Sequence, residues 1–187
     1  MLQLIEGERV TRVLFSQQQI SARVAELAAQ INRDYAGRQV TLLGTLVGSS
    51  IFHADLARAV TLDVQLDFMK VSSYGSGTRS MGVVEMTHPP SLPLEGRHII
   101  VVEDIVDTGY TAACLAEYFK DKNVASYAFC TFLNKPSRRE VPDIECKYTG
   151  FDVEDVFVVG YGLDYAQRYR NLPYLGALEF VNVKEVS

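Results

Sequence analysis

The sequence predicts an α/β domain built on a mostly parallel central sheet flanked by helices. An amphipathic helix is followed by two strand–loop–helix units, and further apolar strand segments come after them. The chain has 187 residues, of which 48% are hydrophobic, and this is enough to bury one sizeable core. Because no internal repeat, low-complexity tract or long linker divides the sequence, residues 1–187 are expected to form a single domain.

The first predicted element is an amphipathic helix that ends near Gly37. Ser16 followed by Gln19 is typical of a capping box, and apolar residues recur at helical spacing from 20 to 31. The first strand–loop–helix unit comes next, with a buried strand at 40–43, a loop of small residues at 44–50 and a helix at 51–60.

The middle of the chain predicts a hairpin and then the second unit. Residues 64–71 alternate as a strand, the Ser- and Gly-rich segment SSYGSGTRSMG at 72–82 predicts a loop, and 83–86 is extended again. The second unit consists of an apolar strand at 99–102 and a helix at 111–119. Further strands are predicted at 124–133, 156–159 and 178–183.

Composition and charge exclude several classes of function. Lys and Arg total 18 against 23 for Asp and Glu, so the net charge of −5 disfavours both nucleic-acid binding and a polybasic membrane anchor. No apolar run approaches the roughly 18 residues of a membrane span, and the charged N-terminal segment is not typical of a signal peptide. A cytoplasmic protein is expected. The three cysteines and three histidines lack metal-site spacing.

The segment 99–111 (IIVVEDIVDTGYT) carries the strongest functional signal. An apolar strand ends in acids, and a Thr-Gly-x-Thr turn then begins a helix, so free amides, hydroxyls and the helix dipole make a site for a monoester phosphate. Glu103 and Asp104 stand where a ribose diol or Mg²⁺ would bind, and Asp107 can exchange a proton with a ring nitrogen. The alternative is a loop in which Asp107 and Thr108 only cap the helix.

Within this segment, VVEDIVDTGYT resembles the signature with which type I phosphoribosyltransferases bind 5-phosphoribosyl 1-pyrophosphate (PRPP). Other blocks are similar to the hypoxanthine (hypoxanthine-guanine) branch of that family: FHADLAR, SSYGSGTRSMG, LNKPSRR and DVFVVGYGLDYAQRYRNLPYLGAL. The resemblance implies the type I phosphoribosyltransferase fold, with a flexible hairpin loop and a small C-terminal hood. It also implies a purine salvage enzyme that makes IMP and GMP plus pyrophosphate from hypoxanthine, guanine and PRPP, with Mg²⁺.

The resemblance also implies roles for residues on the purine side. Asp107 is the expected acid/base beside the purine N7, Phe157 stacks on the ring, and Val158 reads the base edge through its backbone, near Asp164. Lys135 donates to the exocyclic oxygen. Since an ammonium group only donates hydrogen bonds, this lysine favours a 6-oxopurine over the amino group of adenine.

The PRPP side follows in the same way. Arg170 is expected to bind pyrophosphate, Glu103 and Asp164 to hold Mg²⁺, and the loop residues Ser73 and Tyr74 to close over the reacting centre. The complete set of residues implied to contact PRPP or the nucleotide is Glu103, Asp104, Ile105, Val106, Asp107, Thr108, Gly109, Tyr110, Thr111, Val47, Gly48 and Arg170.

Two positions depart from the family pattern. Many relatives have a basic residue at the position of Val47, in a peptide that can be cis, and some have one at the position of Tyr110. Phosphate capture by amides and hydroxyls survives these changes, so they are expected to tune affinity. Taken without the family, the run from Lys135 to Arg139 is equally typical of a solvated basic turn, and Phe157 of a core strand.

Two other functions compete with the enzyme. A PRPP-sensing regulator of the same fold would bind nucleic acid, for which the net charge of −5 offers no basic face. A nucleotide-dependent oxidoreductase would need a GxGxxG turn after a strand, and this chain has none. The expected partners are therefore PRPP and a 6-oxopurine, with no nucleic acid and no membrane, and the family resemblance implies a dimer or tetramer.

Overall fold

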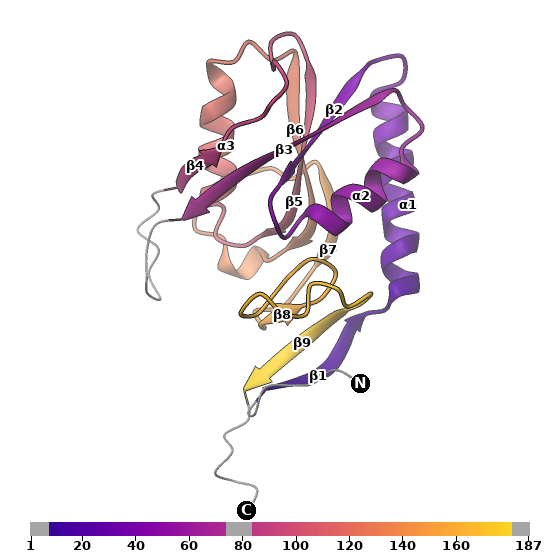
Figure 1. The fold of residues 1–187 in the computed structure, drawn as a ribbon, viewed down its shortest axis with the longest axis vertical. Helices are drawn as coiled ribbons and strands as arrows, with labels where there is room; N and C mark the ends of the chain where they lie inside the picture. The colour runs from indigo at the N-terminus through magenta and orange to yellow at the C-terminus, as the bar shows by residue number, and fades with distance from the viewer. Residues whose placement is uncertain (1–7, 74–83, 181–187) are drawn as a thin grey trace, which may run out of the picture.

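The computed structural model describes residues 8–73 and 84–180, which form a six-stranded sheet, three helices and a small second sheet (Figure 1). Five neighbouring strands of the large sheet run parallel, and the sixth, at one edge, is antiparallel. In spatial order the large sheet consists of β4 (Val84–His88), β3 (Val64–Ser73), β2 (Val40–Thr45), β5 (His98–Val106), β6 (Ser126–Asn134) and β7 (Tyr148–Asp152).

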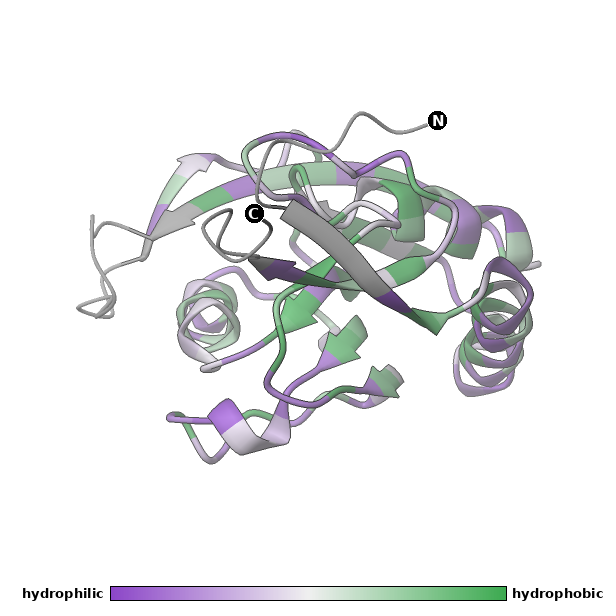
Figure 2. Ribbon diagram, turned by 90° about the horizontal axis from the view of Figure 1, so that it is seen from below, coloured by the Kyte–Doolittle hydropathy of each residue, from purple (hydrophilic) through white to green (hydrophobic). Residues whose placement is uncertain are grey.

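Helices cover both faces of this sheet (Figure 1). Helices α1 (Gln17–Asp34) and α2 (Ser50–Ala59) pack on one face, with apolar side chains of β2, β5 and β6 beneath them. Helix α3 (Tyr110–Lys120) packs on the other face through a second cluster that includes Leu115 and Phe119. Figure 2 shows hydrophobic residues concentrated on the strands, whereas the flanking helices mix both colours. The predicted α/β class with a mostly parallel sheet is therefore confirmed.

The start of α1 shows how closely local sequence determines structure. The Ser16 hydroxyl accepts from the Gln19 amide, and the Gln19 side chain accepts from the Ser16 amide, so the predicted capping box is present. The buried face of the helix contains Ile20, Val24 and Leu27, at the spacing that the sequence predicts.

A small antiparallel sheet forms a hood across the carboxyl ends of the parallel strands (Figure 1). It consists of β1 (Glu8–Phe15), β9 (Leu175–Phe180) and β8 (Val158–Val159), in that order. The strands predicted at 156–159 and 178–183 thus belong to the hood and do not extend the large sheet. The last residues of the second prediction lie outside the described part of the chain.

Several strands of the structure are absent from the sequence predictions or longer than predicted. Strands β1 and β7 were not predicted, and β5 continues beyond the predicted end at residue 102 to Val106. Strand β5 continues through its two acidic residues because β2 and β6 pair with it on either side and supply partners for its backbone hydrogen bonds. The short 3-10 helix η1 (Pro136–Arg138) follows β6.

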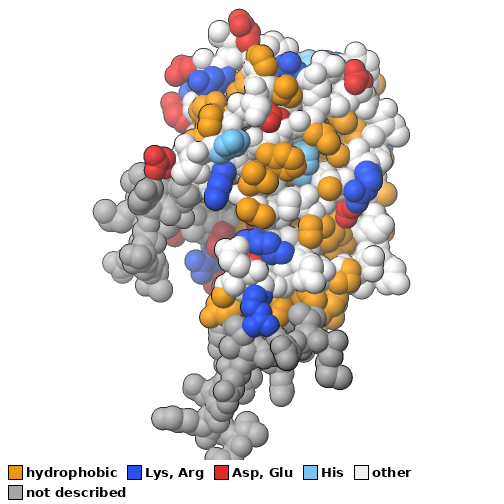
Figure 3. Space-filling model, in the orientation of Figure 1, with side chains coloured by type: hydrophobic (Ala, Val, Ile, Leu, Met, Phe, Trp, Pro, Cys, Tyr) orange, Lys and Arg blue, Asp and Glu red, His pale blue; other side chains and the backbone are white. Residues whose placement is uncertain are grey.

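Three further observations bear on composition and charge. None of the helices in the described residues is both long enough and apolar enough to cross a membrane. Cys114, Cys130 and Cys146 are reduced and form no disulfide. On the face drawn in Figure 3, Lys and Arg side chains are scattered singly among acidic and apolar ones, so this face presents no basic stripe.

Candidate active site

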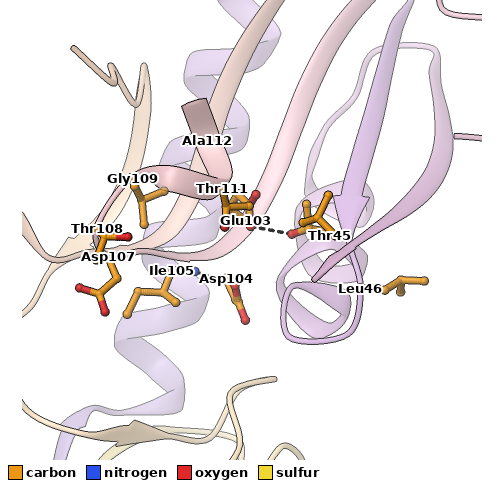
Figure 4. Close-up of a pocket in the computed structure, with 12 residues that line it drawn as sticks. Thr45, Leu46, Glu103, Asp104, Ile105, Asp107, Thr108, Gly109, Thr111 and Ala112 are labelled. Carbon is orange, nitrogen blue, oxygen red and sulfur yellow. Dashed lines mark hydrogen bonds between the residues drawn. The ribbon is translucent and has the colours of Figure 1, made fainter. Parts of the chain in front are cut away.

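Two consecutive acids, Glu103 and Asp104, lie toward the carboxyl end of β5 and line a cavity at this edge of the sheet. Glu103 is only 5% exposed, and its Oε2 accepts a hydrogen bond of 2.7 Å from the Thr45 hydroxyl at the end of β2 (Figure 4). Its Oε1 is buried without a hydrogen-bond partner among the described residues. Burial and the neighbouring charge of Asp104 raise the pKa of Glu103 to about 8, so the free protein keeps this carboxyl protonated near neutral pH.

Asp104 lies against the loop that follows β2. A Cβ added to Gly48 would overlap the Asp104 carboxylate, so only glycine allows the two segments to approach this closely. Burial raises the pKa of Asp104, although hydrogen bonds from backbone amides and the charge of Arg170 act in the opposite direction. The peptide between Leu46 and Val47 is cis, the isomer that the family resemblance allows.

The turn after β5 leads directly into the N-terminus of α3, where an anion site is predicted. Gly109 adopts a φ of 95° at the N-cap, a conformation that favours glycine, and the first amides of the helix are left without intrahelical acceptors. The Thr108 carbonyl accepts from the amides of Glu140 and Val141, which holds the turn in place. The amides, the Thr111 side chain and the helix dipole face one cavity of about 270 Å³ (Figure 4).

A second cavity of about 460 Å³ adjoins the first. Asp104, Ile105 and Asp107 line both, so the two cavities form one continuous cleft. We call the side formed by Thr45, residues 103–109 and Thr111, with Gly48 against Asp104, the phosphate wall, after the ligand group expected there. The other side is called the purine wall, after the base expected there, and consists of Lys135, Arg138, Asp155, Phe157, Val158 and Asp164.

The purine wall combines an exposed aromatic ring with a buried cation. Phe157 is 46% exposed and packs edge-on against Tyr165 at 5.6 Å, so it is not the core aromatic that its strand context suggests. Lys135 is only 7% exposed, and its Nζ donates to the Val156 carbonyl at 2.8 Å. The interpretation of Lys135 as part of a solvated basic turn is therefore wrong.

Charged side chains alternate along this wall. Lys135 Nζ lies 3.7 Å from Asp155, and the Arg138 guanidinium lies 3.4 Å from the same carboxylate. Arg138 Nε also donates to Asp107 Oδ1 at 2.9 Å. The pKa of Arg138 is raised by the charges of Asp107 and Asp155. The charges therefore alternate in a row of Lys135, Asp155, Arg138 and Asp107, and the candidate acid/base Asp107 lies at its end. Its carboxylate accepts from Arg138, and the N-cap of α3 is Gly109, so the alternative in which Asp107 only caps the helix is wrong.

The hood closes the cleft through a tight backbone contact. A Cβ added to Gly162 would overlap the Gly48 carbonyl oxygen, so the hood and the loop after β2 lie in van der Waals contact. Arg170 donates to the Gly162 carbonyl at 2.7 Å and pairs with Asp164 at 2.7 Å. The Tyr161 hydroxyl donates to Asp55 of α2 at 2.6 Å, which ties the hood to the main domain.

Not every residue of the predicted site faces the cleft. Tyr110 donates its hydroxyl to Glu140 at 2.9 Å and does not line either cavity. Val47 is 46% exposed beside the cis peptide. Ser73 is the last residue of β3, where its backbone pairs with Val84, and Tyr74 lies outside the described residues.

Three residues of the cleft have no role predicted from the sequence. Thr45 ends an otherwise ordinary buried strand, and Asp155 is the first residue of the family block DVFVVGYGLDYAQRYRNLPYLGAL, whose resemblance implies no role for it. Arg138 belongs to a basic run whose members have very different surroundings. The only signal for Arg138 is the family block LNKPSRR, which does not indicate which of its two arginines reaches the cleft.

The residues present fit a Mg²⁺ ion shared with a substrate. No group of three metal-binding side chains occurs in the part of the chain that the structure describes, so a site made entirely by the protein is not present there. Mg²⁺ commonly uses one or two carboxylates together with substrate phosphates and water. Glu103 offers a buried oxygen without a partner, and Asp104 and Asp164 line the adjoining cavity.

Comparison with known proteins agrees with this geometry. The model of the phosphoribosyl transferase domain matches residues 12–166. The chain belongs to the phosphoribosyltransferase family. A hypoxanthine-guanine phosphoribosyltransferase of Streptococcus pneumoniae is 44% identical over 170 residues, covering 91% of this chain and 94% of the relative. A hypoxanthine phosphoribosyltransferase of Haemophilus influenzae is 44% identical over 167 residues, covering 88% and 93%.

Solved structures extend the similarity to the whole phosphoribosyltransferase fold. A hypoxanthine phosphoribosyltransferase of Staphylococcus aureus superposes with a TM-score of 0.86 at 38% identity, covering 96% of this chain and 98% of that one. A hypoxanthine-guanine phosphoribosyltransferase of Bacillus anthracis gives a TM-score of 0.85 at 38% identity, covering 91% and 98%. The predicted family, its fold and its class of enzyme are confirmed.

Proposed function

We propose that this phosphoribosyltransferase joins a 6-oxopurine, hypoxanthine or guanine, to PRPP, giving a nucleoside 5′-monophosphate and pyrophosphate. The observation that carries the proposal is the continuous cleft, because the N-terminus of α3 lies on one side of it and an exposed aromatic ring beside a buried lysine lies on the other. The names of the relatives, hypoxanthine and hypoxanthine-guanine phosphoribosyltransferases, support the same substrates.

Residues 107–111 hold the 5′-phosphate of PRPP in this proposal. The turn supplies amides and the positive end of the α3 dipole, and a lysine is not required for this kind of site. Glu103 and Asp104 accept hydrogen bonds from the ribose hydroxyls, and Arg170 of the hood approaches the pyrophosphate. Gly48 brings the loop after β2 close enough for its backbone to contact the same group.

The purine lies between Phe157 and the end of β5. Lys135 donates to the 6-oxo group, which explains a preference over adenine, and the Val158 backbone contacts the base edge. The purine N9 attacks C1′, the C1′–O bond to pyrophosphate breaks, and the bonding electrons leave with pyrophosphate. The N7 proton passes to the Asp107 carboxylate as the new bond forms.

Glu103 and Asp164 are the residues proposed to hold Mg²⁺. When bound, the ion neutralises charge that develops on the departing pyrophosphate. The positive charge that develops on the ribose lies beside the Asp104 side chain, whose charged form it favours. A dimer or tetramer and a cytoplasmic location remain predictions from the sequence.

The test is a spectrophotometric assay of the purified protein with PRPP and Mg²⁺, with hypoxanthine, guanine, xanthine and adenine supplied in separate reactions. We expect IMP from hypoxanthine, GMP from guanine and the lowest efficiency with adenine. In Lys135→Met the preference for 6-oxopurines over adenine should collapse. No product with any base, despite measurable PRPP binding, would overturn the proposal and favour a PRPP-sensing regulator.

A further inference from the structure

We propose that Arg138 is a positioning residue for the transfer reaction, which fixes the Asp107 carboxylate toward the purine by bridging it to Asp155. The inference deepens the proposed function and rests on it. The guanidinium stands between two carboxylates from different parts of the chain, since Asp107 follows β5 and Asp155 precedes β8. Arg138 itself ends η1, so it connects three segments at the purine wall.

The geometry of the bridge leaves part of Asp107 available to a substrate. Arg138 Nε donates to Oδ1 of Asp107 at 2.9 Å, and Nη1 lies 3.4 Å from each carboxylate oxygen of Asp155. With Oδ1 held in this way, the second oxygen of Asp107 is left to accept the purine N7 proton. Both carboxylates and the guanidinium line the same cavity.

The charges explain why a cation is needed at this place. Asp107 and Asp155 line one cavity, and the ammonium of Lys135 approaches only Asp155, at 3.7 Å. Asp107 accepts a proton only as a carboxylate, and the Arg138 guanidinium holds one oxygen of that carboxylate by a charge-assisted hydrogen bond. Arginine suits the position because its planar fork reaches two carboxylates at once, whereas a lysine ammonium is a single point of charge.

The bridge is too exposed to be important for folding. The side chains of Arg138, Asp107 and Asp155 are 44%, 38% and 55% exposed, and ion pairs of this kind contribute little to the free energy of unfolding. An effect on turnover without an effect on unfolding would therefore distinguish positioning from a structural role.

The first experiment compares Arg138→Gln with Arg12→Gln. The control, Arg12→Gln, breaks another exposed ion pair, in which Arg12 lies 3.0 Å from Glu154. Glu154 precedes Asp155 in the sequence but does not line the cleft. We expect Arg138→Gln to lower the turnover of hypoxanthine by about 10- to 100-fold, the cost of misplacing a reacting group. The KM for PRPP and the unfolding temperature should stay unchanged, and Arg12→Gln should match the wild type.

Two further variants make the result decisive. In an Asp107→Asn background, Arg138→Gln should cost no further turnover, because the group that it positions is already lost. The turnover of Arg138→Lys should lie between that of the wild type and that of Arg138→Gln. If Arg138→Gln unfolds at a lower temperature than the wild type, Arg138→Lys takes its place in the comparison. Equal losses from Arg138→Gln in both backgrounds, or full turnover in either Arg138 variant, would overturn the inference alone. Absence of nucleotide from the wild-type protein would overturn the proposed function as well.

Discussion

The two walls of the cleft use charge in opposite ways. On the phosphate wall, Glu103 and Asp104 are withdrawn from water at the end of a buried strand, and one oxygen of Glu103 has no partner among the described residues. On the purine wall, Asp155 and Arg138 are largely exposed and form ion pairs. Burial makes the charged form of both acids costly and raises the pKa of each, so a bound cation would favour their ionisation.

The difference predicts how each wall responds to substitution. Changes on the phosphate wall should affect both stability and PRPP binding, because its groups are buried against the sheet. Changes on the purine wall should affect the base and the rate of transfer while leaving unfolding nearly unchanged. Asp107 lines both cavities, so it lies at the junction of the phosphate wall and the purine wall.

The largest effect is expected at this junction. Asp107→Asn removes the group that takes the N7 proton and should lower turnover by roughly 10²- to 10⁴-fold, the usual contribution of a positioned acid/base. The affinity for PRPP with Mg²⁺, measured by calorimetry, should change little. Unchanged turnover would remove Asp107 from the mechanism.

Gly48→Ala should break the phosphate wall. The new methyl group overlaps the Asp104 carboxylate, so the loop or the carboxylate must move, at a cost of about 1–3 kcal/mol in the free energy of unfolding. PRPP affinity should fall with it. Val47→Ala, at the neighbouring exposed position, is the control for stability and should unfold like the wild type. If Gly48→Ala were equally stable, the close approach would have no consequence.

Thr45→Val should have a smaller effect on the same wall. The substitution keeps the shape of the side chain but leaves Glu103 Oε2 without its 2.7 Å hydrogen bond. A loss of about 0.5–1.5 kcal/mol in the free energy of unfolding is expected for the lost hydrogen bond, together with weaker PRPP binding. Thr45→Ser keeps the hydroxyl and should retain wild-type affinity. Equal affinities in the Val and Ser variants would show that the hydroxyl does not orient Glu103.

The last prediction is a pH dependence of stability in the ligand-free protein. Between the ordinary carboxyl pKa of 4.5 and the raised pKa of about 8, the folded protein keeps a proton on Glu103 that the unfolded chain releases. Stability should therefore decline as the pH rises through this window and level off above it. In Glu103→Gln this component is absent, so thermal unfolding of the two proteins at several pH values isolates it. Parallel curves would mean that Glu103 is ionised in the fold.

The phosphate wall was predictable from sequence because local chemistry determines it. An apolar strand, acids at its end and a turn that needs a glycine at a φ of 95° are contiguous from 99 to 111. The capping box of α1 was found for the same reason. The resemblance to the family placed Lys135 and Phe157, whose local surroundings alone favoured other interpretations.

The remainder depends on contacts between distant segments. Strand β1 exists because it pairs with β9, more than 150 residues away in sequence, and no period in its own residues indicates this. Thr45 matters only because β2 lies beside β5, and Arg138 only because η1 faces the end of β5. Lys135 is buried whereas Arg138, three residues later, is exposed, and the sequence of this basic run does not indicate that difference.

The most direct test of the account is a crystal structure of the protein with IMP, pyrophosphate and Mg²⁺. The account predicts the 5′-phosphate on the amides of residues 107–111, the purine stacked on Phe157 with its 6-oxo group at Lys135, and Asp107 beside N7. A nucleotide bound in the opposite sense, with its base against the turn of residues 107–111, would contradict the assignment of the two walls.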